Sequence, residues 1–160
     1  MDVPIIYQPL FELLDESNHK QVDTVIITGG RLSGKSFCTS IFSVTGAILN
    51  GWRGIYLRFT NTSILDSIKS EVDEKIDLLS VQKYVSINNN NITFSSGGYI
   101  SFKGIKTSSN NNTANLKSLK DFNLMVIDEA EEIPDFGTFK KVYYSIRSNS
   151  KRNLSILILN

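Results

Sequence analysis

Short runs of apolar residues, each bounded by polar ones, mark the strands of this chain. Residues 25–28 are mostly β-branched and apolar, Leu124–Ile127 form a continuous apolar run, and Leu154–Leu159 are apolar apart from one serine. Residues 55–59 form a fourth, mostly apolar run. Runs of this kind are typical of strands that are buried on both faces, as in a parallel sheet.

A helical spacing follows the first strand. Apolar residues recur at intervals of four, three and four positions, which places them on one helix face: Phe37, Ile41, Val44 and Ile48. Gly51 predicts the end of this helix, because glycine readily adopts the left-handed geometry that closes helices. The strand at 55–59 then completes a strand–helix–strand unit, which makes its two strands parallel.

Two further helices are predicted downstream, and Asn61 or Thr62 is positioned to cap the first. Its apolar stripe consists of Leu65, Ile68, Val72, Ile76 and Leu79. Its charged residues are expected to face solvent: Lys69, Glu71, Asp73, Glu74 and Lys75. The second helix is marked by Phe136, Phe139, Tyr143 and Ile146.

The remaining segments have other patterns. Residues 83–104 alternate between apolar and polar positions around polar turns, which predicts a small antiparallel meander inserted into the parallel sheet. Pro4 and Pro9 bracket residues 5–8 and predict an extended lead-in, followed by a short helix over 10–14. Together the patterns predict an α/β fold with a mostly parallel central sheet flanked by helices.

Composition adds few constraints. The chain has 160 residues, 41% hydrophobic and 21% charged, which is typical of one globular domain. The net charge of +1 gives no indication of a polyanion partner, so any nucleic-acid site is expected to be a local patch. The single cysteine, Cys38, excludes a disulfide framework and favours a reduced, cytoplasmic setting. We expect no membrane span and no secretory signal.

The glycine-rich loop after the first strand carries the strongest chemical signal. It fits the pattern G-x-x-x-x-G-K-[ST] at Gly29, Gly34, Lys35 and Ser36. Glycine leaves backbone N–H groups open to a phosphate, and the helix that follows adds free donors and the positive end of its dipole. Lys35 would neutralise the outer phosphates, and the Ser36 hydroxyl would ligate Mg²⁺. The alternative is a glycine-rich helix cap that binds nothing.

An acidic pair follows another predicted strand. Asp128 and Glu129 come directly after Leu124–Ile127, at the sheet edge where ligands of open α/β sheets bind. Asp128 would hold the water shell of Mg²⁺, and Glu129 would orient or deprotonate an attacking water. The alternative is an acidic helix start that Glu131 and Glu132 extend. The glycine loop upstream favours the catalytic interpretation.

Other residues have weaker signals. Tyr7 and Gln8 combine an aromatic face and an amide that suit an adenine ring, although plain packing and exposure explain them equally well. Arg58 lies near a strand end, where ligand contacts occur, or on the surface. Lysines flank a polar loop at 107–115 and suit phosphate contacts or solubility: Lys103, Lys106, Lys117 and Lys120. The densest basic stretch comprises Lys140, Lys141, Arg147, Lys151 and Arg152.

Five motifs together resemble the N-terminal ATPase of phage large terminase subunits, the motors that pump viral DNA into procapsids. They are G-G-R-x-S-G-K-S at 29–36, L-R-F-T with a later D-S at 57–67, F-K-G at 102–104, L-K-S at 116–118 and I-D-E-A-E-E at 127–132. The glycine loop and the acidic pair occur in many ATPases, whereas the combination is more discriminating. The resemblance implies a P-loop NTPase fold of the ASCE type, with residues 1–160 as a single ATPase domain.

The resemblance also implies a strand order and site roles. It places Leu154–Leu159 between the strands at 25–28 and Leu124–Ile127, so that Asn160 lies near the γ-phosphate. Arg31 matches an arginine used against the transition-state phosphate, since a guanidinium offsets charge on the phosphoryl oxygens. A solvent-facing arginine is the alternative. The expected nucleotide contacts are Tyr7, Gln8, Gly29, Gly30, Arg31, Leu32, Ser33, Gly34, Lys35, Ser36, Phe37 and Asn160.

The implied function is hydrolysis of ATP with Mg²⁺ to translocate double-stranded DNA into a procapsid, with Glu129, Arg31 and Lys35 as catalytic residues. The implied partners are double-stranded DNA, a portal protein, a small terminase subunit and further copies of this chain in a ring, in the host cell cytoplasm. A neighbouring subunit inserts an arginine in some family members, for which Arg147 is one candidate, and Lys117 or Lys120 would serve less well.

Departures and alternatives remain. The family carries a C-terminal nuclease domain that this sequence does not supply, so we expect a fragment or a natural truncation that holds the motor alone. A helicase-like ATPase would need further motifs or a second motor domain. A small-molecule kinase would need an acceptor pocket and has no use for Glu129 as a water-activating base. A nucleotide-dependent switch would show negligible turnover.

Overall fold

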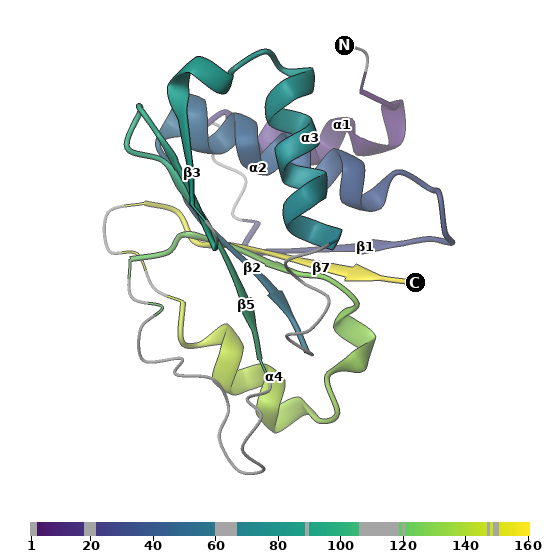
Figure 1. The fold of residues 1–160 in the computed structure, drawn as a ribbon. Coiled ribbons are helices and arrows are strands. Elements are labelled where there is room, and N and C mark those ends of the chain that lie inside the picture. Colours follow the sequence, from purple (N-terminus) through teal and green to yellow (C-terminus); the bar gives the residue numbers. More distant parts are fainter. Residues whose placement is uncertain are drawn as a thin grey trace.

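A seven-stranded sheet between two helical layers organises the computed structural model, which describes residues 3–17, 22–59, 67–88, 90–105, 119, 121–146, 148 and 151–160 (Figure 1). The strands are β1 (Thr24–Thr28), β2 (Arg53–Arg58), β3 (Val85–Asn88), β4 (Asn91–Phe94), β5 (Tyr99–Gly104), β6 (Leu124–Ile127) and β7 (Leu154–Leu159). The α-helices are α1 (Gln8–Phe11), α2 (Lys35–Asn50), α3 (Lys69–Leu78) and α4 (Phe136–Tyr143). Short 3-10 helices are η1 (Ile5–Tyr7), η2 (Glu12–Leu14), η4 (Gln82–Tyr84) and η6 (Ala130–Glu132).

The strand order confirms the expected place of the C-terminal strand. The sheet runs β1-β7-β6-β2-β5-β4-β3, so β7 pairs in parallel with β1 on one side and β6 on the other. The meander is confirmed as well, since β3, β4 and β5 pair antiparallel. Its third strand, β5, also pairs in parallel with β2, so the meander extends the main sheet at one edge.

The central strands are mostly apolar because each packs against both helical layers. In β6, Val126 belongs to the core on the α2 and α3 side, whereas Met125 and Ile127 belong to the core on the α4 side. Figure 1 shows α1, α2 and α3 on one face of the sheet and α4 on the other. Phe42 of α2 and Val142 of α4 are fully buried in these two cores. The two helical layers therefore cover both faces of the sheet and leave the ends of its strands accessible to ligands.

The N-terminal segment differs from the extended lead-in that the two prolines predict. Ile5–Tyr7 form a 3-10 turn, and α1 follows directly. Pro9 stands in the first turn of α1, where a missing N–H costs no intrahelical hydrogen bond and the fixed φ suits a helix. The prediction of an extended segment was wrong because proline is also a favoured residue at helix starts.

Lys75 also differs from its prediction. It is expected to face solvent, but its side chain is buried. Its side chain is 5% exposed, and Nζ lies 4.5 Å from the centroid of the Phe37 ring. The same atom pairs with the carboxylates of Glu71 and Glu74. The ring and the two carboxylates compensate for the loss of hydration of the ammonium group. The expected cap of this helix, at Asn61 or Thr62, lies outside the described residues.

Helix ends follow the predicted signals in part. Gly51 closes α2 with φ 59°, and the Trp52 N–H donates to the Gly46 carbonyl at 3.2 Å, as expected for a glycine stop. α4 ends at Tyr143, so Ile146 lies beyond the helix although it still packs in the core on that side. Within the described ranges, no helix combines the length and apolar character that crossing a membrane requires.

Candidate functional site

The glycine loop and the acidic pair meet at the carboxyl edge of the parallel strands. The loop follows β1, Asp128 follows β6 and Asn160 follows β7, and these three strands are neighbours in the sheet. A cavity of about 600 Å³ lies at this edge, within the usual range for small-molecule sites. It is lined by Arg31, Leu32, Ser33, Gly34, Lys35, Ser36, Phe37, Arg58, Glu71, Asp128, Glu129, Ile158 and Asn160.

The loop conformation depends on glycine at two of its fixed positions. Gly34 stands at the N-cap of α2 with φ 81°, in the left-handed region. Gly29 has φ 157°, and a Cβ there would lie 3.1 Å from the Ser33 hydroxyl oxygen. Leu32 also has a positive φ, 65°, and its side chain is fully exposed. The N-terminus of α2 therefore opens onto the cavity, where its free N–H groups and dipole favour an anion.

Lys35 lies within the loop and is 6% exposed. Its Nζ donates to the carbonyl oxygens of Gly29 and Gly30, the latter at 2.9 Å, and lies 3.4 Å from the Ser33 hydroxyl oxygen. The loop thus holds a positive charge at its centre. For Lys35 to contact the outer phosphates, these bonds to neutral carbonyls must be exchanged for bonds to phosphate oxygens, which are stronger when charge-assisted. That contact stays a prediction.

Arg58 joins both carboxylates of the acidic pair. Its Nη2 lies 2.9 Å from Asp128 Oδ2 and 2.7 Å from Glu129 Oε1, and its Nη1 donates to the Ser67 hydroxyl at 3.3 Å. Strand pairing explains this contact, since β2 and β6 are neighbours and Arg58 ends β2. The sequence allows two interpretations of Arg58, a ligand contact or a surface residue. The structure places it on the cavity wall, 12% exposed.

Burial raises the pKa of Asp128 above its ordinary value, and the Arg58 guanidinium opposes the shift. Burial likewise raises the pKa of Glu129, again against Arg58, while the charge of Asp128 adds to the increase. Glu129 has φ 51°, a left-handed conformation that is uncommon outside glycine and occurs at functional sites. A carboxylate with a raised pKa is the better proton acceptor, as a water-activating base requires.

Tyr7 and Gln8 do not line the cavity. The Tyr7 side chain is 7% exposed, its hydroxyl donates to the Ser33 carbonyl at 2.9 Å, and a Cβ at Gly34 would lie 3.8 Å from its ring. Tyr7 therefore ties the N-terminal segment to the glycine loop, while Gln8 is exposed at the start of α1. An adenine contact by either residue stays a prediction.

Asn160 and Phe37, two of the expected nucleotide contacts, both line the cavity. Asn160 lines the cavity, and its backbone N–H donates to Glu131 Oε1 at 3.2 Å. Phe37 also lines the cavity, 37% exposed, beneath the ammonium group of Lys75. Glu71 was expected to face solvent, but it lines the same cavity. Its spacing of four from Lys75 predicts a helical ion pair, whereas the face that carries the pair depends on how α3 packs on α2.

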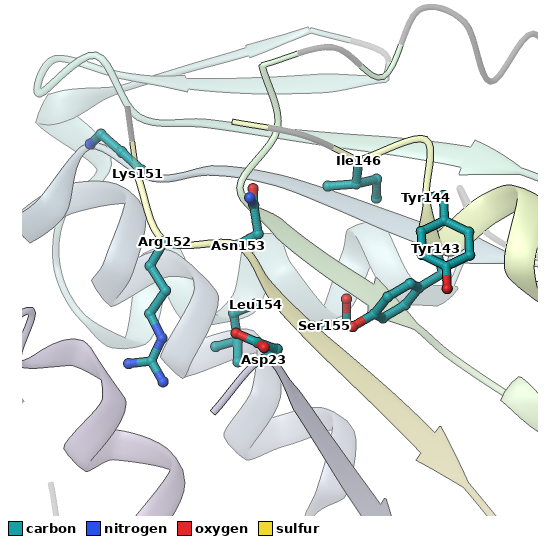
Figure 2. A pocket seen from close by; sticks show the side chains of 9 residues that line it. All are labelled: Asp23, Tyr143, Tyr144, Ile146, Lys151, Arg152, Asn153, Leu154 and Ser155. Atoms are coloured by element: carbon teal, nitrogen blue, oxygen red, sulfur yellow. The ribbon is translucent and has the colours of Figure 1, made fainter. Parts of the chain in front are cut away.

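Three of the four lysines that flank the 107–115 loop lie outside the described residues: Lys106, Lys117 and Lys120. Arg147 of the basic stretch also lies outside them. Lys151 and Arg152 lie beside a second cavity of about 440 Å³ at the amino ends of β1 and β7 (Figure 2). Arg152 donates to the Val22 carbonyl at 2.7 Å, and Lys151 donates to the carbonyls of Asn50 and Gly51. Both cations thus stabilise backbone carbonyls far from the carboxyl edge where the glycine loop lies.

A divalent cation would need ligands from a bound phosphate at this site. In the part of the chain that the structure describes, no group of three or more His, Cys, Asp or Glu side chains is arranged to hold a metal ion. Ser36 and Asp128 both line the main cavity and a smaller recess of about 170 Å³ beside it. One hydroxyl and one carboxylate with phosphate oxygens match how Mg²⁺ is usually bound with nucleotides.

Comparison with known proteins identifies the family of this chain. A family model described as phage terminase large subunit matches residues 21–160. No curated protein matches the chain. Among solved structures, the HK97 bacteriophage large terminase is 13% identical, with a TM-score of 0.71 over 99% of this chain and 33% of that one. The large terminase of a thermophilic bacteriophage is 14% identical, with a TM-score of 0.66 over 96% of this chain and 38% of that one.

A third structure, the N-terminal domain of the DNA packaging ATPase from bacteriophage phi29, is 13% identical and has a TM-score of 0.66 over 96% of this chain and 77% of that one. The chain spans half or less of the first matched structures, with shares of 49%, 33% and 38%. These likenesses confirm the mostly parallel α/β fold expected from the sequence. Because the family model covers nearly the whole chain, this chain belongs to the phage terminase large-subunit family.

Proposed function

We propose that this chain is the ATPase part of a DNA-packaging motor, which hydrolyses ATP with Mg²⁺ to translocate double-stranded DNA into a procapsid. The observation that carries the proposal is the meeting of three parts in one cavity: the glycine loop, the N-terminus of α2 and the acidic pair. A helix N-terminus with a buried lysine binds the triphosphate, and a carboxylate placed beside it can activate a water.

Nucleotide binding rests on the loop and on the first turn of α2. The backbone N–H groups of residues 29–36 surround the phosphates, and Lys35 turns from the loop carbonyls to the outer phosphates. The Ser36 hydroxyl and the Asp128 carboxylate hold the cation, which when bound screens the phosphate charge. Both side chains line the same recess, which supports this assignment.

Hydrolysis needs a base and a group that stabilises the transition state. Glu129 lines the same cavity as the glycine loop, and its raised pKa suits proton acceptance from water. Arg31 is exposed, lines the cavity and supplies a guanidinium to the developing negative charge. Glu129 is paired with Arg58, so it must share or leave that ion pair to meet a water.

The proposal also includes the coupling of ATP hydrolysis to the movement of DNA. Asn160 follows β7 beside the cavity and contacts Glu131, so a change at the outermost phosphate can move the segment after β7. By family membership we propose that the working assembly is a ring of copies in the host cell cytoplasm, together with a portal protein and a small terminase subunit. Two of the similar structures are the Phi-28 gp11 DNA packaging motor and the bacteriophage Phi-29 viral genome packaging motor assembly, which supports a role in a packaging motor.

The first experiment measures ATP binding and phosphate release by this chain with Mg²⁺. Glu129→Gln should retain ATP binding and lose hydrolysis by about 10²-fold or more, because general-base catalysis contributes about 10²–10⁴-fold. Lys35→Ala should lose binding. The matched control is Glu132→Gln, a nearby exposed carboxylate outside the cavity, which should leave binding unchanged and lower hydrolysis far less than Glu129→Gln does.

Other results would favour other functions. Phosphate transfer to a small acceptor that survives Glu129→Gln would indicate a kinase. ATP binding without turnover, even with DNA and procapsid partners, would indicate a nucleotide-dependent switch. Strand separation of a duplex in the same assay would indicate a helicase-like ATPase. Unchanged ATP binding by Lys35→Ala would contradict the nucleotide site itself.

A further inference from the structure

Helix α3 contributes a carboxylate to the cavity that no motif of the sequence marks. Glu71 lines the main cavity together with Ser36, Arg58 and Asp128. It also lines the smaller recess of about 170 Å³, which Ser36, Arg58 and Asp128 share. The main cavity and the recess therefore have these four polar side chains in common, from α2, β2, the end of β6 and α3. Glu71 is the one among them that lies in none of the five motifs on which the family resemblance rests.

A buried lysine fixes the position of Glu71. Lys75 Nζ lies 3.7 Å from Glu71 Oε1 and 3.2 Å from Glu74 Oε2, and it stands 4.5 Å from the centroid of the Phe37 ring. Phe37 follows Ser36 in the first turn of α2, so the lysine anchors α3 directly beside the metal-binding hydroxyl of the proposed site. The Glu71 side chain is 32% exposed, and its ion pair with Lys75 restricts the positions open to it.

The charges around Lys75 do not cancel. Two carboxylates share one ammonium group, which leaves one net negative charge on this part of α3. Glu74 is 70% exposed and does not line the cavity, so water screens its charge. Of the two carboxylates that pair with Lys75, Glu71 is the one that lines the cavity. Its position in the first turn of α3 gives it a favourable helix-dipole interaction, which accounts for stability but not for its place on the cavity wall.

We infer that Glu71 is a further acidic residue of the nucleotide site, placed to favour the divalent cation and to disfavour a bare triphosphate. The inference rests on the proposed function, since it assumes that Mg–ATP binds at the loop. A carboxylate near Ser36 attracts a cation held there and repels the phosphates when no cation screens them. Glu71 therefore makes nucleotide binding more dependent on the metal than the loop and Asp128 alone would.

This role predicts two effects of opposite sign. Glu71→Gln should weaken binding of ATP in the presence of Mg²⁺ and strengthen binding of ATP in the presence of a chelator. A partly exposed charge pair is worth about 0.2–1 kcal/mol, so each affinity should change by up to about fivefold. The ratio of the two affinities should fall by about two- to 25-fold, because the two changes multiply. Loss of packing alone would shift both affinities in the same direction.

The experiment is calorimetric titration of this chain with ATP, once with Mg²⁺ and once with a chelator. The matched control is Glu74→Gln, because Glu74 also pairs with Lys75 but does not line the cavity. Glu74→Gln should keep the wild-type ratio. Glu71→Asp retains the charge and should restore most of the ratio, and thermal unfolding confirms that each variant is folded.

Three outcomes overturn the inference. Equal changes in Glu71→Gln and Glu74→Gln would mean that both residues act only through Lys75. Equal weakening of both affinities in Glu71→Gln would mean a structural role. An unchanged ratio in a folded Glu71→Gln variant would remove Glu71 from the site. Failure of the proposed function is distinguished by Lys35→Ala: if wild type binds ATP no better than this variant, the loop site is wrong and the inference falls with it.

Discussion

Replacing Arg58 by glutamine tests how far the acidic pair depends on one cation. Arg58 Nη2 lies 2.9 Å from Asp128 Oδ2 and 2.7 Å from Glu129 Oε1, and the three side chains are 12%, 12% and 30% exposed. Removing one partner of a buried ion pair costs about 3–5 kcal/mol, because the other charge is left uncompensated. Since Glu129 is partly exposed, we expect the free energy of unfolding at neutral pH to fall by about 2–4 kcal/mol.

The loss of unfolding free energy in Arg58→Gln should become smaller as pH falls. Burial already raises the pKa of Asp128 and of Glu129 against the influence of Arg58, so removing Arg58 raises both further in the folded state only. When the folded-state pKa exceeds the unfolded value, stability is lost as pH rises through the folded pKa. The gap between wild type and Arg58→Gln should therefore narrow as pH falls toward the ordinary values of 3.8 and 4.5.

Urea unfolding followed by circular dichroism, at several pH values below neutrality, measures this gap. Arg53→Gln is the matched control, because Arg53 stands at the other end of β2 and its guanidinium lies 5.5 Å from the centroid of the Tyr99 ring. That variant should lose no more than about 1 kcal/mol, with no dependence on pH. Equal losses in the two variants, or a gap that stays constant with pH, would refute the reasoning.

Two further predictions concern the support of the site. Tyr7→Phe removes the hydroxyl that donates to the Ser33 carbonyl, so unfolding by urea should show a loss of about 1 kcal/mol, and affinities for ATP and for inorganic tripolyphosphate should fall by the same factor. A loss confined to ATP would instead indicate contact with the base. Gly98→Ala would place a Cβ 2.1 Å from the Ala47 carbonyl oxygen of α2, so the thermal midpoint should fall by an amount that corresponds to about 2–3 kcal/mol. An unchanged midpoint would mean that the turn before β5 can shift away from α2 without a loss of stability.

The local signals in the sequence were sufficient for most elements of the fold. Continuous apolar runs predicted the central strands, because strands covered on both faces must be apolar throughout. Gly51 predicted the end of α2, because few other residues adopt its φ at low cost. The prolines at positions 4 and 9 were misinterpreted, since the same ring suits both an extended segment and the first turn of a helix. Only the structure shows which of the two forms here, a 3-10 turn at Ile5–Tyr7 followed directly by α1.

The residues of the site also fall into two groups, those that the sequence marks and those that only the structure identifies. The glycine loop and Asp128–Glu129 were recognisable because their chemistry depends on fixed spacing along the chain. Arg58 and Glu71 were not assigned, because their roles arise from contacts across the sheet and between helices. Lys75 shows the limit most clearly: a lysine among charged residues is normally solvated, yet here a ring from α2 and two carboxylates surround it.

By itself the sequence determined the order of elements, the loop that suits a phosphate and the acidic residues that suit a cation, because each is encoded within a few consecutive positions. Only the tertiary structure decided which side chains share the cavity with them. Strand order brought Arg58 onto both carboxylates, and the packing of α3 on α2 turned Glu71 inward. These contacts join residues that are far apart in the chain, and the free energy that selects them belongs to the packed core as a whole.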